Sequence, residues 1–137
     1  MGYELIDHTG DLGIRVWAED LAAIFCEAAR ALFDIITDLN RITVKLVREV
    51  TVTGRDREEL LVAWLNELLY LHEVEGLLFR DFAVNRIDES NMEGVAKGEP
   101  MQQNEHVIKT GIKAVTYHQL ELSHKGKQWQ ARIVLDI

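Results

Sequence analysis

The sequence predicts an α+β protein in which two helices pack on one face of a mostly antiparallel sheet, as two layers in a single domain over residues 1–137. Three observations support this class. The chain is long enough for one hydrophobic core. Two stretches repeat apolar residues with helical spacing, and about seven others alternate apolar and polar residues as strands do. Most of these strands follow one another as hairpins, which excludes a doubly wound parallel sheet.

The first stretch, residues 3–16, is predicted to form two short strands around a tight polar turn. The turn brings together Asp7, His8, Thr9 and Asp11. Carboxylates at such short separation repel one another unless a positive group or solvent compensates them. The run alone leaves two interpretations open: a solvated loop tip, or a bound cation.

Two amphipathic helices are predicted next. The first begins after Glu19 and Asp20, whose carboxylates suit the positive end of a helix dipole, and it ends near Thr37. The second begins at Asp56, in a sequence typical of a capping box, and Gly76 is a natural stop for it. We expect the apolar stripes of both helices to belong to the core.

Between and after the helices we expect more strands. Residues 42–53 are rich in β-branched side chains, and the break in their alternation at Val47 predicts a β-bulge. Residues 77–87 and 92–97 are predicted to form a hairpin turned at residues 88–91. The polar residues that follow suggest a loop.

The last third of the chain again has the strand pattern. We predict two strands that pair with each other, at residues 110–116 and 118–123, then a turn at residues 125–127. A final strand over residues 129–137 places Asp136 on the side opposite its most apolar row. Because the strand pattern continues to the last residue, we expect this end to be held in place rather than frayed.

Composition and charge exclude several classes of function. The formal net charge is −8, from 15 basic and 23 acidic residues, so strong direct binding to nucleic acid is not expected. No apolar run is long enough to span a membrane, and the start does not resemble a signal peptide. The single cysteine, Cys26, fits a reducing compartment, and we expect the protein to be cytoplasmic.

A cation site is one hypothesis for the two ends of the chain. If the N-terminal turn lies beside the final strand, Asp11, Asp136 and the Ile137 carboxylate supply three oxygen donors. Such donors suit Ca²⁺, Mg²⁺ or Mn²⁺. Asp7 and His8 would then be additional ligands or would support the ligands from behind. The adjacency itself is inferred from strand count and polarity.

Motifs for catalysis are absent from the sequence, which has no glycine-rich phosphate loop, no HExxH and no nucleophile elbow. We therefore expect no enzymatic activity. We expect His72 to lie at the edge of the core, on the apolar side of the second helix. Lys113 is either a buried cation near the acidic corner or an exposed sheet residue. The five histidines do not have metal-ligand spacing: His8, His72, His106, His118 and His124.

Four segments of the chain resemble the archease family. Residues 3–14, YELIDHTGDLGI, are similar to its opening motif, with Gly10 where alanine is usual. Residues 113–118, KAVTYH, resemble its second signature, and residues 134–137, VLDI, resemble its terminus. Residues 60–69 resemble its central helix. The resemblance therefore spans the chain in the right order.

This resemblance implies a small α/β protein that activates RtcB-type RNA ligases, the enzymes of tRNA splicing and RNA repair. Archeases promote the ligase's covalent guanylate intermediate, so that the ligase turns over repeatedly with GTP and a metal ion. The resemblance also implies a divalent-cation site, described as calcium-binding, at Asp11, Asp136 and Ile137. This set coincides with the oxygen donors proposed above, and Ca²⁺ is expected ahead of Mg²⁺ or Mn²⁺.

An acidic activator suits a ligase whose cleft binds RNA and GTP, because opposite charges steer the two proteins together. His8, Lys113 and His118 are candidates for orienting the acidic corner or contacting the partner; hydrogen bonding within the sheet is the alternative. Two other functions remain open: a chaperone or modulator of RNA-modifying enzymes, and, less favoured, a metal-dependent hydrolase.

Overall fold

The computed structural model describes residues 1–8 and 11–137, without the side chains of Asp7 and His8. Strands outnumber helices in the described chain. The elements in chain order are β1 (Gly2–His8), β2 (Asp11–Ala18), α1 (Leu21–Ile36), the short 3₁₀ helix η1 (Leu39–Arg41), β3 (Leu46–Thr53), α2 (Arg57–Glu75), β4 (Leu77–Ile87), β5 (Asn91–Pro100), β6 (Ala114–Lys125) and β7 (Gln128–Asp136). Neither long helix is both long and apolar enough to cross a membrane.

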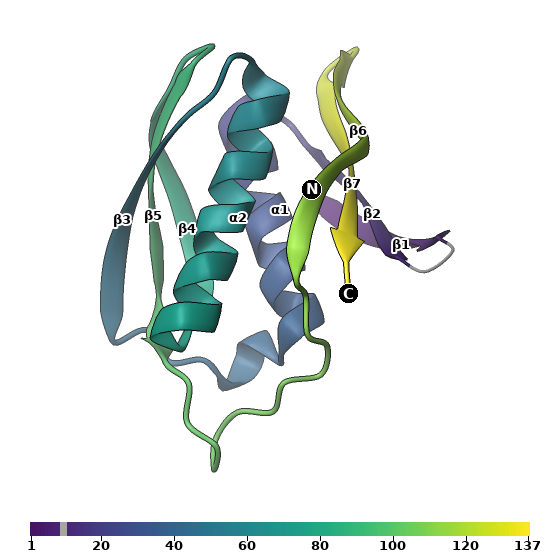
Figure 1. Ribbon diagram of the computed structural model, residues 1–137. Helices are drawn as coiled ribbons and strands as arrows, with labels where there is room; N and C mark the ends of the chain where they lie inside the picture. Colours follow the sequence, from purple (N-terminus) through teal and green to yellow (C-terminus); the bar gives the residue numbers. More distant parts are fainter. Residues whose placement is uncertain (9–10) are drawn as a thin grey trace.

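The strands form two antiparallel sheets, and the two long helices lie between them (Figure 1). One sheet has the order β1-β2-β7-β6 and the other β3-β5-β4. Helix α1 contacts β2 of the first sheet and β4 of the second, while α2 contacts β6 and β3. The α+β class, the two helices and the antiparallel pairing are thus confirmed. The expected single sheet with two layers is replaced by two sheets and three layers.

The helices themselves explain the third layer. Helix α2 buries Leu60, Leu61 and Val62 at consecutive positions, which point in three directions around a helix. A helix that is apolar on several sides must be covered on several sides. One sheet leaves part of this surface in water, and the second sheet covers it.

Aromatic rings fill the space between α1 and the three-stranded sheet. Phe33 of α1 meets Phe79 edge to face, with ring centres 5.6 Å apart, and Phe82 lies beside both. Trp64 of α2 is fully buried, and its Nε1–H donates a hydrogen bond to the Phe25 carbonyl at 3.0 Å. These contacts join the two helices to each other and to β4.

The predicted helix ends are confirmed. Asp20 caps α1 by accepting from the Ala23 N–H at 2.7 Å, and Asp56 caps α2 by accepting from the Glu59 N–H at 2.8 Å. Gly76 ends α2 with a left-handed φ of 69°, a conformation that glycine adopts at no steric cost.

The strand from residue 42 is shorter than predicted, and its bulge is wrong. β3 begins at Leu46 and pairs with β5 without a shift in register, so Val47 introduces no bulge. The irregularities lie instead in β4, between Phe79 and Asp81 and between Val84 and Arg86. Side chains on this sheet's outer face meet solvent, so an extra apolar residue is tolerated there without changing the register.

Residues 110–123 do not form two strands that pair with each other. β6 is one strand that pairs with β7 along its length, interrupted where residues 117–120 stand opposite Ile133 alone. Gln119 in this interruption has a positive φ of 54°. The segment lacks the glycine or asparagine pair of a tight hairpin turn, so the chain bulges and continues. The predicted turn at residues 125–127 is confirmed, with Gly126 at φ 63°.

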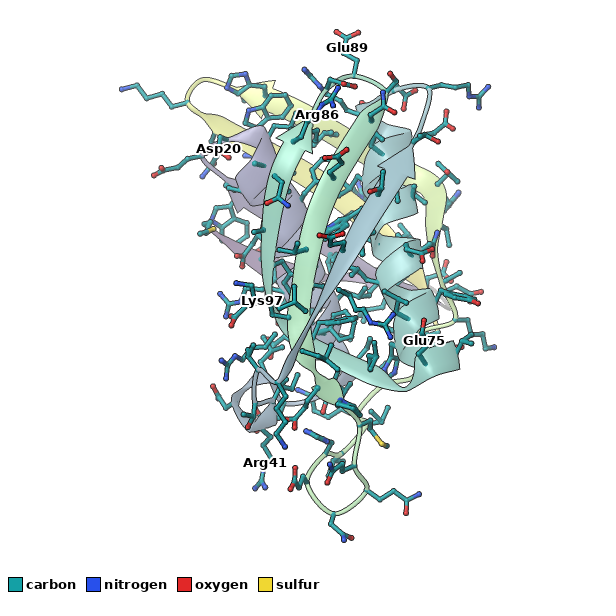
Figure 2. The ribbon with its side chains drawn as sticks, turned by 90° about the vertical axis from the view of Figure 1, so that its left-hand side faces the viewer. Asp20, Arg41, Glu75, Arg86, Glu89 and Lys97 are labelled. Carbon is teal, nitrogen blue, oxygen red and sulfur yellow. The ribbon has the colours of Figure 1, made fainter. Side chains whose placement is uncertain are left out.

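Charged side chains surround the three-stranded sheet (Figure 2). Arg86 and Glu89 lie at one end of it and Arg41 at the other. At the C-terminal end of α2, Glu75 accepts from Arg48 of β3 at 2.5 Å. This sheet therefore offers solvent a mixture of both charges.

A glycine at the centre of the three-stranded sheet gives a test of the fold. A Cβ at Gly98 would lie 1.8 Å from the Leu78 carbonyl oxygen, a backbone atom that has no room to move away. We expect Gly98→Ala to lower the free energy of unfolding by about 3 kcal/mol. Gly111→Ala is the matched control, because a Cβ there meets no atom within 4 Å. Urea denaturation measures both; equal stability of the two variants would show that β4 and β5 do not approach each other here as described.

Candidate cation site where the chain ends meet

The pairing of β2 with β7 brings the two ends of the chain together. Leu12 of β2 stands opposite Leu135 of β7, and Asp11 and Asp136 are the next residues beyond this pair. The predicted adjacency of the two ends is therefore confirmed.

The end of β7 is held on its other side by β6. Asp136 pairs with Ala114, and the Lys113 N–H donates to the Asp136 carbonyl at 2.7 Å. Backbone hydrogen bonds thus extend to the last residue but one. Ile137 follows them with its side chain about half exposed.

Both aspartates lie on the face of the sheet that points away from the helices. Their neighbours Leu12 and Leu135 pack toward the core, and side chains alternate between the two faces of a strand. Asp11 and Asp136 are each partly buried. Carboxylates on neighbouring strands, followed by the Ile137 carboxylate one residue after Asp136, are hard anionic donors of the kind that a divalent cation prefers. The register brings these donor residues together, and the cation itself stays a prediction.

The structure describes only some of the other residues predicted for this site. Asp7 pairs with Leu12 and His8 with Asp11 in the strand register, but both side chains lie outside the described residues. Lys113 is exposed, and its side chain lines a hollow of about 200 Å³ against α2. Of the two interpretations of Lys113, the exposed one agrees with the structure.

His118 lies in the irregular part of β6, where its side chain is exposed and its N–H donates to Thr116 Oγ1 at 3.2 Å. His72 is a partly buried residue at the core edge, as expected. Its Nδ1 lies 2.9 Å from the Leu77 carbonyl, and its ring meets Phe33 edge to face.

A buried hydrogen-bonded pair at the end of β5, Glu99 and His106, was not predicted. Glu99 and His106 are only 1% and 3% exposed, and His106 Nε2 lies 3.1 Å from Glu99 Oε2. The same Glu99 oxygen accepts from the Thr43 N–H at 2.5 Å, and Lys45 Nζ lies 3.4 Å from the other oxygen. His106 stands in a polar segment without periodicity, so the sequence pattern carries no sign of its burial.

Together with Glu105, this pair offers three ligand atoms within 4.8 Å of one another. The hydrogen bonds of Glu99 and His106, however, suit a structural contact better than a metal site, and we call this pair the Glu99 clamp. His106 Nδ1 accepts from the Gln102 N–H at 2.9 Å, so the ring proton must sit on Nε2, where it is donated to Glu99. A metal ion on Nε2 would displace that proton and the hydrogen bond it makes. The pair instead ties the crossover after β5 to the sheet.

Hydrogen bonding keeps Glu99 ionised despite its burial. The Thr43 N–H contributes most to lowering the pKa of the Glu99 carboxyl; burial opposes this, and His106 and Lys45 add to the lowering. The carboxylate therefore stabilises the fold at neutral pH.

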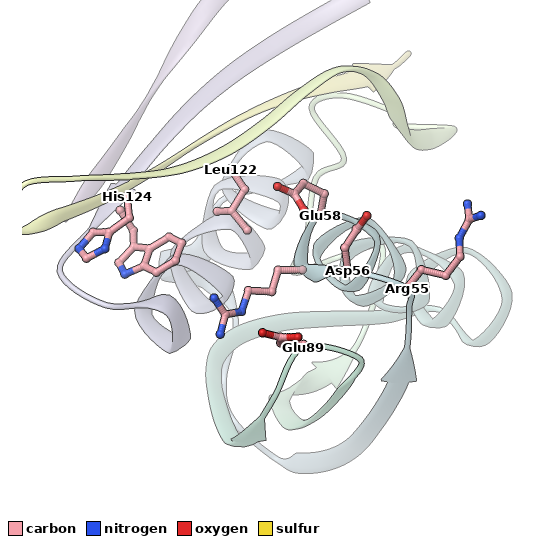
Figure 3. Close-up of a pocket in the computed structure, with 8 residues that line it drawn as sticks. Arg55, Asp56, Glu58, Glu89, Leu122 and His124 are labelled. Atoms are coloured by element: carbon pink, nitrogen blue, oxygen red, sulfur yellow. The ribbon is translucent and has the colours of Figure 1, made fainter.

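A second hollow, of about 400 Å³, lies at the opposite end of the four-stranded sheet (Figure 3). The Arg57 guanidinium carbon lies 6.0 Å from the centre of the Trp129 ring, and His124 stacks on Trp129 with ring centres 4.6 Å apart. Arg55 also lines the hollow, and Asp56 is engaged in capping α2. Glu58 and Glu89 line it as well, so two arginines offset most of the charge of three carboxylates, and the acidic corner is the better candidate for a cation.

The fold and the corner together describe a class: a small α+β protein whose two ends meet on neighbouring strands in an acidic patch. Comparison with known proteins gives the family. The model of the Archease protein family matches residues 3–137. The chain is 40% identical to the archease of Methanopyrus kandleri over the whole of both proteins, and 41% identical to that of Methanosarcina acetivorans over 98% of this chain and 95% of the relative. The chain belongs to the archease family, as its motifs suggested.

Solved structures agree with this assignment. The solution structure of Methanobacterium thermoautotrophicum protein 1598 covers 99% of both chains, with a TM-score of 0.86 at 35% identity. The crystal structure of a Thermotoga maritima archease, described as a possible chaperone, covers 96% of this chain and 94% of its own, with a TM-score of 0.62 at 18% identity. At that identity the second likeness concerns the fold alone.

The Glu99 clamp predicts a pH-dependent contribution to stability. Because the folded-state pKa of Glu99 lies below the unfolded value of about 4.3, its stabilising effect is complete above that pH and is lost as the pH falls through the folded value. We expect Glu99→Gln to cost about 2–3 kcal/mol at pH 7, and its deficit to shrink on acidification. Denaturant unfolding across this range measures the effect, with Glu93→Gln, exposed on the same strand, as control. A deficit that is independent of pH would contradict the ionised clamp.

Proposed function

We propose that this archease is a non-enzymatic activator of an RtcB-type RNA ligase, working in the cytoplasm in tRNA splicing or RNA repair. We further propose that it acts through a divalent cation, Ca²⁺ in the first place, held by Asp11, Asp136 and the Ile137 carboxylate. Membership of the family supports the first part. The observation that carries the second is the register of β2 and β7, which makes the two aspartates neighbours.

The chemistry of the corner supports a bridging role for the cation. Calcium takes 6–8 oxygen ligands, and three carboxylates of this chain leave positions for oxygens from outside it. When bound, the cation would supply positive charge to phosphate oxygens of the ligase's nucleotide. The chain's own residues hold the ion on a sheet that is hydrogen-bonded up to Asp136, so the site is rigid where it meets the partner.

The charge of the chain supports an encounter with a basic partner. With a net charge of −8, the protein is attracted toward a cleft that binds RNA and GTP. Such steering raises the rate of association and falls with increasing salt.

The chaperone alternative has less support from the surface. A general chaperone needs a large contiguous apolar patch. The exposed large apolar side chains of the described residues are spread over β1, β3, α2, β6, the loop before β6 and the two ends of the chain, with at most two on any one of them. The hydrolase alternative requires a general base beside the metal, and the sequence has neither an HExxH motif nor a nucleophile elbow.

Cation binding can be measured without any partner. We expect calorimetry to detect Ca²⁺ binding to the full chain, and Asp136→Asn to weaken it at least tenfold, because one charged ligand is lost. A C-terminal extension should also weaken binding, since it converts the Ile137 carboxylate to an amide. Asp81→Asn, an exposed aspartate on β4, is the matched control. Equal affinity of Asp136→Asn and the control would refute the cation site.

Ligase activation is the second measurement. Catalytic amounts of this protein should increase guanylylation and turnover of an RtcB-type ligase supplied with GTP, and Asp11→Ala and Asp136→Ala should each abolish most of that increase. Asp81→Ala should stimulate as the unmodified chain does. If the unmodified chain gives no stimulation, the activator role fails; if both corner variants stimulate fully, only the cation mechanism fails.

A further inference from the structure

We propose that a second site on the four-stranded sheet, formed around Arg15 and Arg132, binds a phosphate group. The two arginines stand directly opposite each other on β2 and β7. Their neighbours Ile14, Val16 and Ile133 are fully buried toward the helices, so both arginines project from the open face.

Such a pairing is costly unless something compensates it. Directly opposed residues on antiparallel strands have Cβ atoms about 4.5–5.5 Å apart, and like charges at that distance destabilise a sheet. Glu4, opposite Arg15 on β1, compensates one of the two, with an Nη1–Oε1 distance of 3.0 Å. Glu121 stands opposite Arg132 on β6, but no carboxylate oxygen of the described residues lies within 4.0 Å of the Arg132 guanidinium.

Arg132 therefore keeps most of its hydrogen-bonding capacity. Its only contact with another side chain that falls within hydrogen-bonding distance in the described structure is a long one, 3.5 Å from Nη2 to Gln119 Oε1. A guanidinium has five N–H donors in a planar fork. This fork matches two oxygens of a phosphate group.

The surroundings of the arginines form a hollow of suitable chemistry. It has a volume of about 160 Å³ and is lined by Arg15, Glu121, Ser123, Lys125, Gln130, Ala131 and Arg132. Three cationic side chains and two neutral hydrogen-bonding ones face a single carboxylate. In a chain with more acidic than basic residues, this concentration of positive charge favours an anion with several oxygens over a metal ion.

The hollow shares its face of the sheet with the acidic corner. Arg132 and Asp136 are four residues apart on β7, on the same side, which corresponds to about 13 Å. A phosphate held by the arginines thus lies on the surface that, in the function proposed above, meets the ligase. This relation depends on the proposed function, whereas phosphate binding itself does not.

The test uses the full-length chain labelled with ¹⁵N and two probes, inorganic pyrophosphate and a short single-stranded RNA. We expect pyrophosphate to shift the amide signals of Arg15, Lys125 and Arg132, and Arg132→Gln to weaken its binding about tenfold. Arg132→Lys, which keeps the charge and loses the fork, should give an intermediate affinity. Arg86→Gln on the other sheet (Figure 2) is the matched control and should bind as the unmodified chain does.

The outcomes separate the sources of the phosphate and the two proposed sites. Displacement of pyrophosphate by RNA identifies a nucleic-acid backbone; binding of pyrophosphate alone identifies a free phosphate or nucleotide. If Arg132→Gln fails to fold, Lys125→Gln, exposed at the end of the hairpin, provides the same comparison. The proposal is overturned if neither probe shifts these amides, or if the arginine and lysine variants bind with unchanged affinity. Asp136→Ala should retain pyrophosphate binding, so loss of ligase activation alone leaves this site intact.

Discussion

The antiparallel pairing of β2 with β7 determines how the four-stranded sheet, its buried face and its charged face are arranged. These two central strands carry β1 and β6 on their outer edges. Their inward residues, Ile14, Val16 and Ile133, cover one side of the helices. The pairing joins residues more than a hundred positions apart, such as Leu12 and Leu135. Closing so long a loop is entropically costly and slow, so the acidic corner and the arginine pair exist only once most of the chain has folded.

Features that depend on local sequence could be predicted, and those that depend on which strands meet could not. Asp20, Asp56 and Gly76 act on backbone groups within a few residues, so the helix ends follow from the sequence alone. The division of the strands into two sheets is a long-range property. Its best local sign was the run of apolar residues at 60–62, which no single sheet can cover. The interruption in β6 was wrongly predicted to separate two paired strands, for a related reason. An alternation of apolar and polar residues that breaks and then resumes looks the same in a sequence whether the chain forms a bulge or a turn.

The same distinction between local and long-range features applies to the candidate site. The meeting of Asp11 with Asp136 was foreseeable, because a strand pattern that runs to the chain end needs a partner there. Lys113 lines a hollow together with residues of α2, and the sequence around Lys113 does not show where that helix lies. The burial of His106 depends on Glu99, at the end of another element, and on a crossover without periodicity. Buried polar pairs of this kind satisfy each other, and neither partner alone has a pattern that predicts its burial.

The open face of the four-stranded sheet carries two pairs of like charges with opposite sign. Asp11 and Asp136 are neighbours at its end, and Arg15 and Arg132 are neighbours four residues along β7. Elsewhere the surface neutralises itself, as where Arg48 meets Glu75. Like charges fixed on paired strands cannot move apart, because the backbone ladder holds their Cβ atoms about 5 Å apart. In the proposals made above, a cation relieves the aspartates and an oxyanion relieves the arginines. If both proposals hold, a phosphate-bearing nucleotide with its metal ion would supply the two opposite charges to one surface built from four strands.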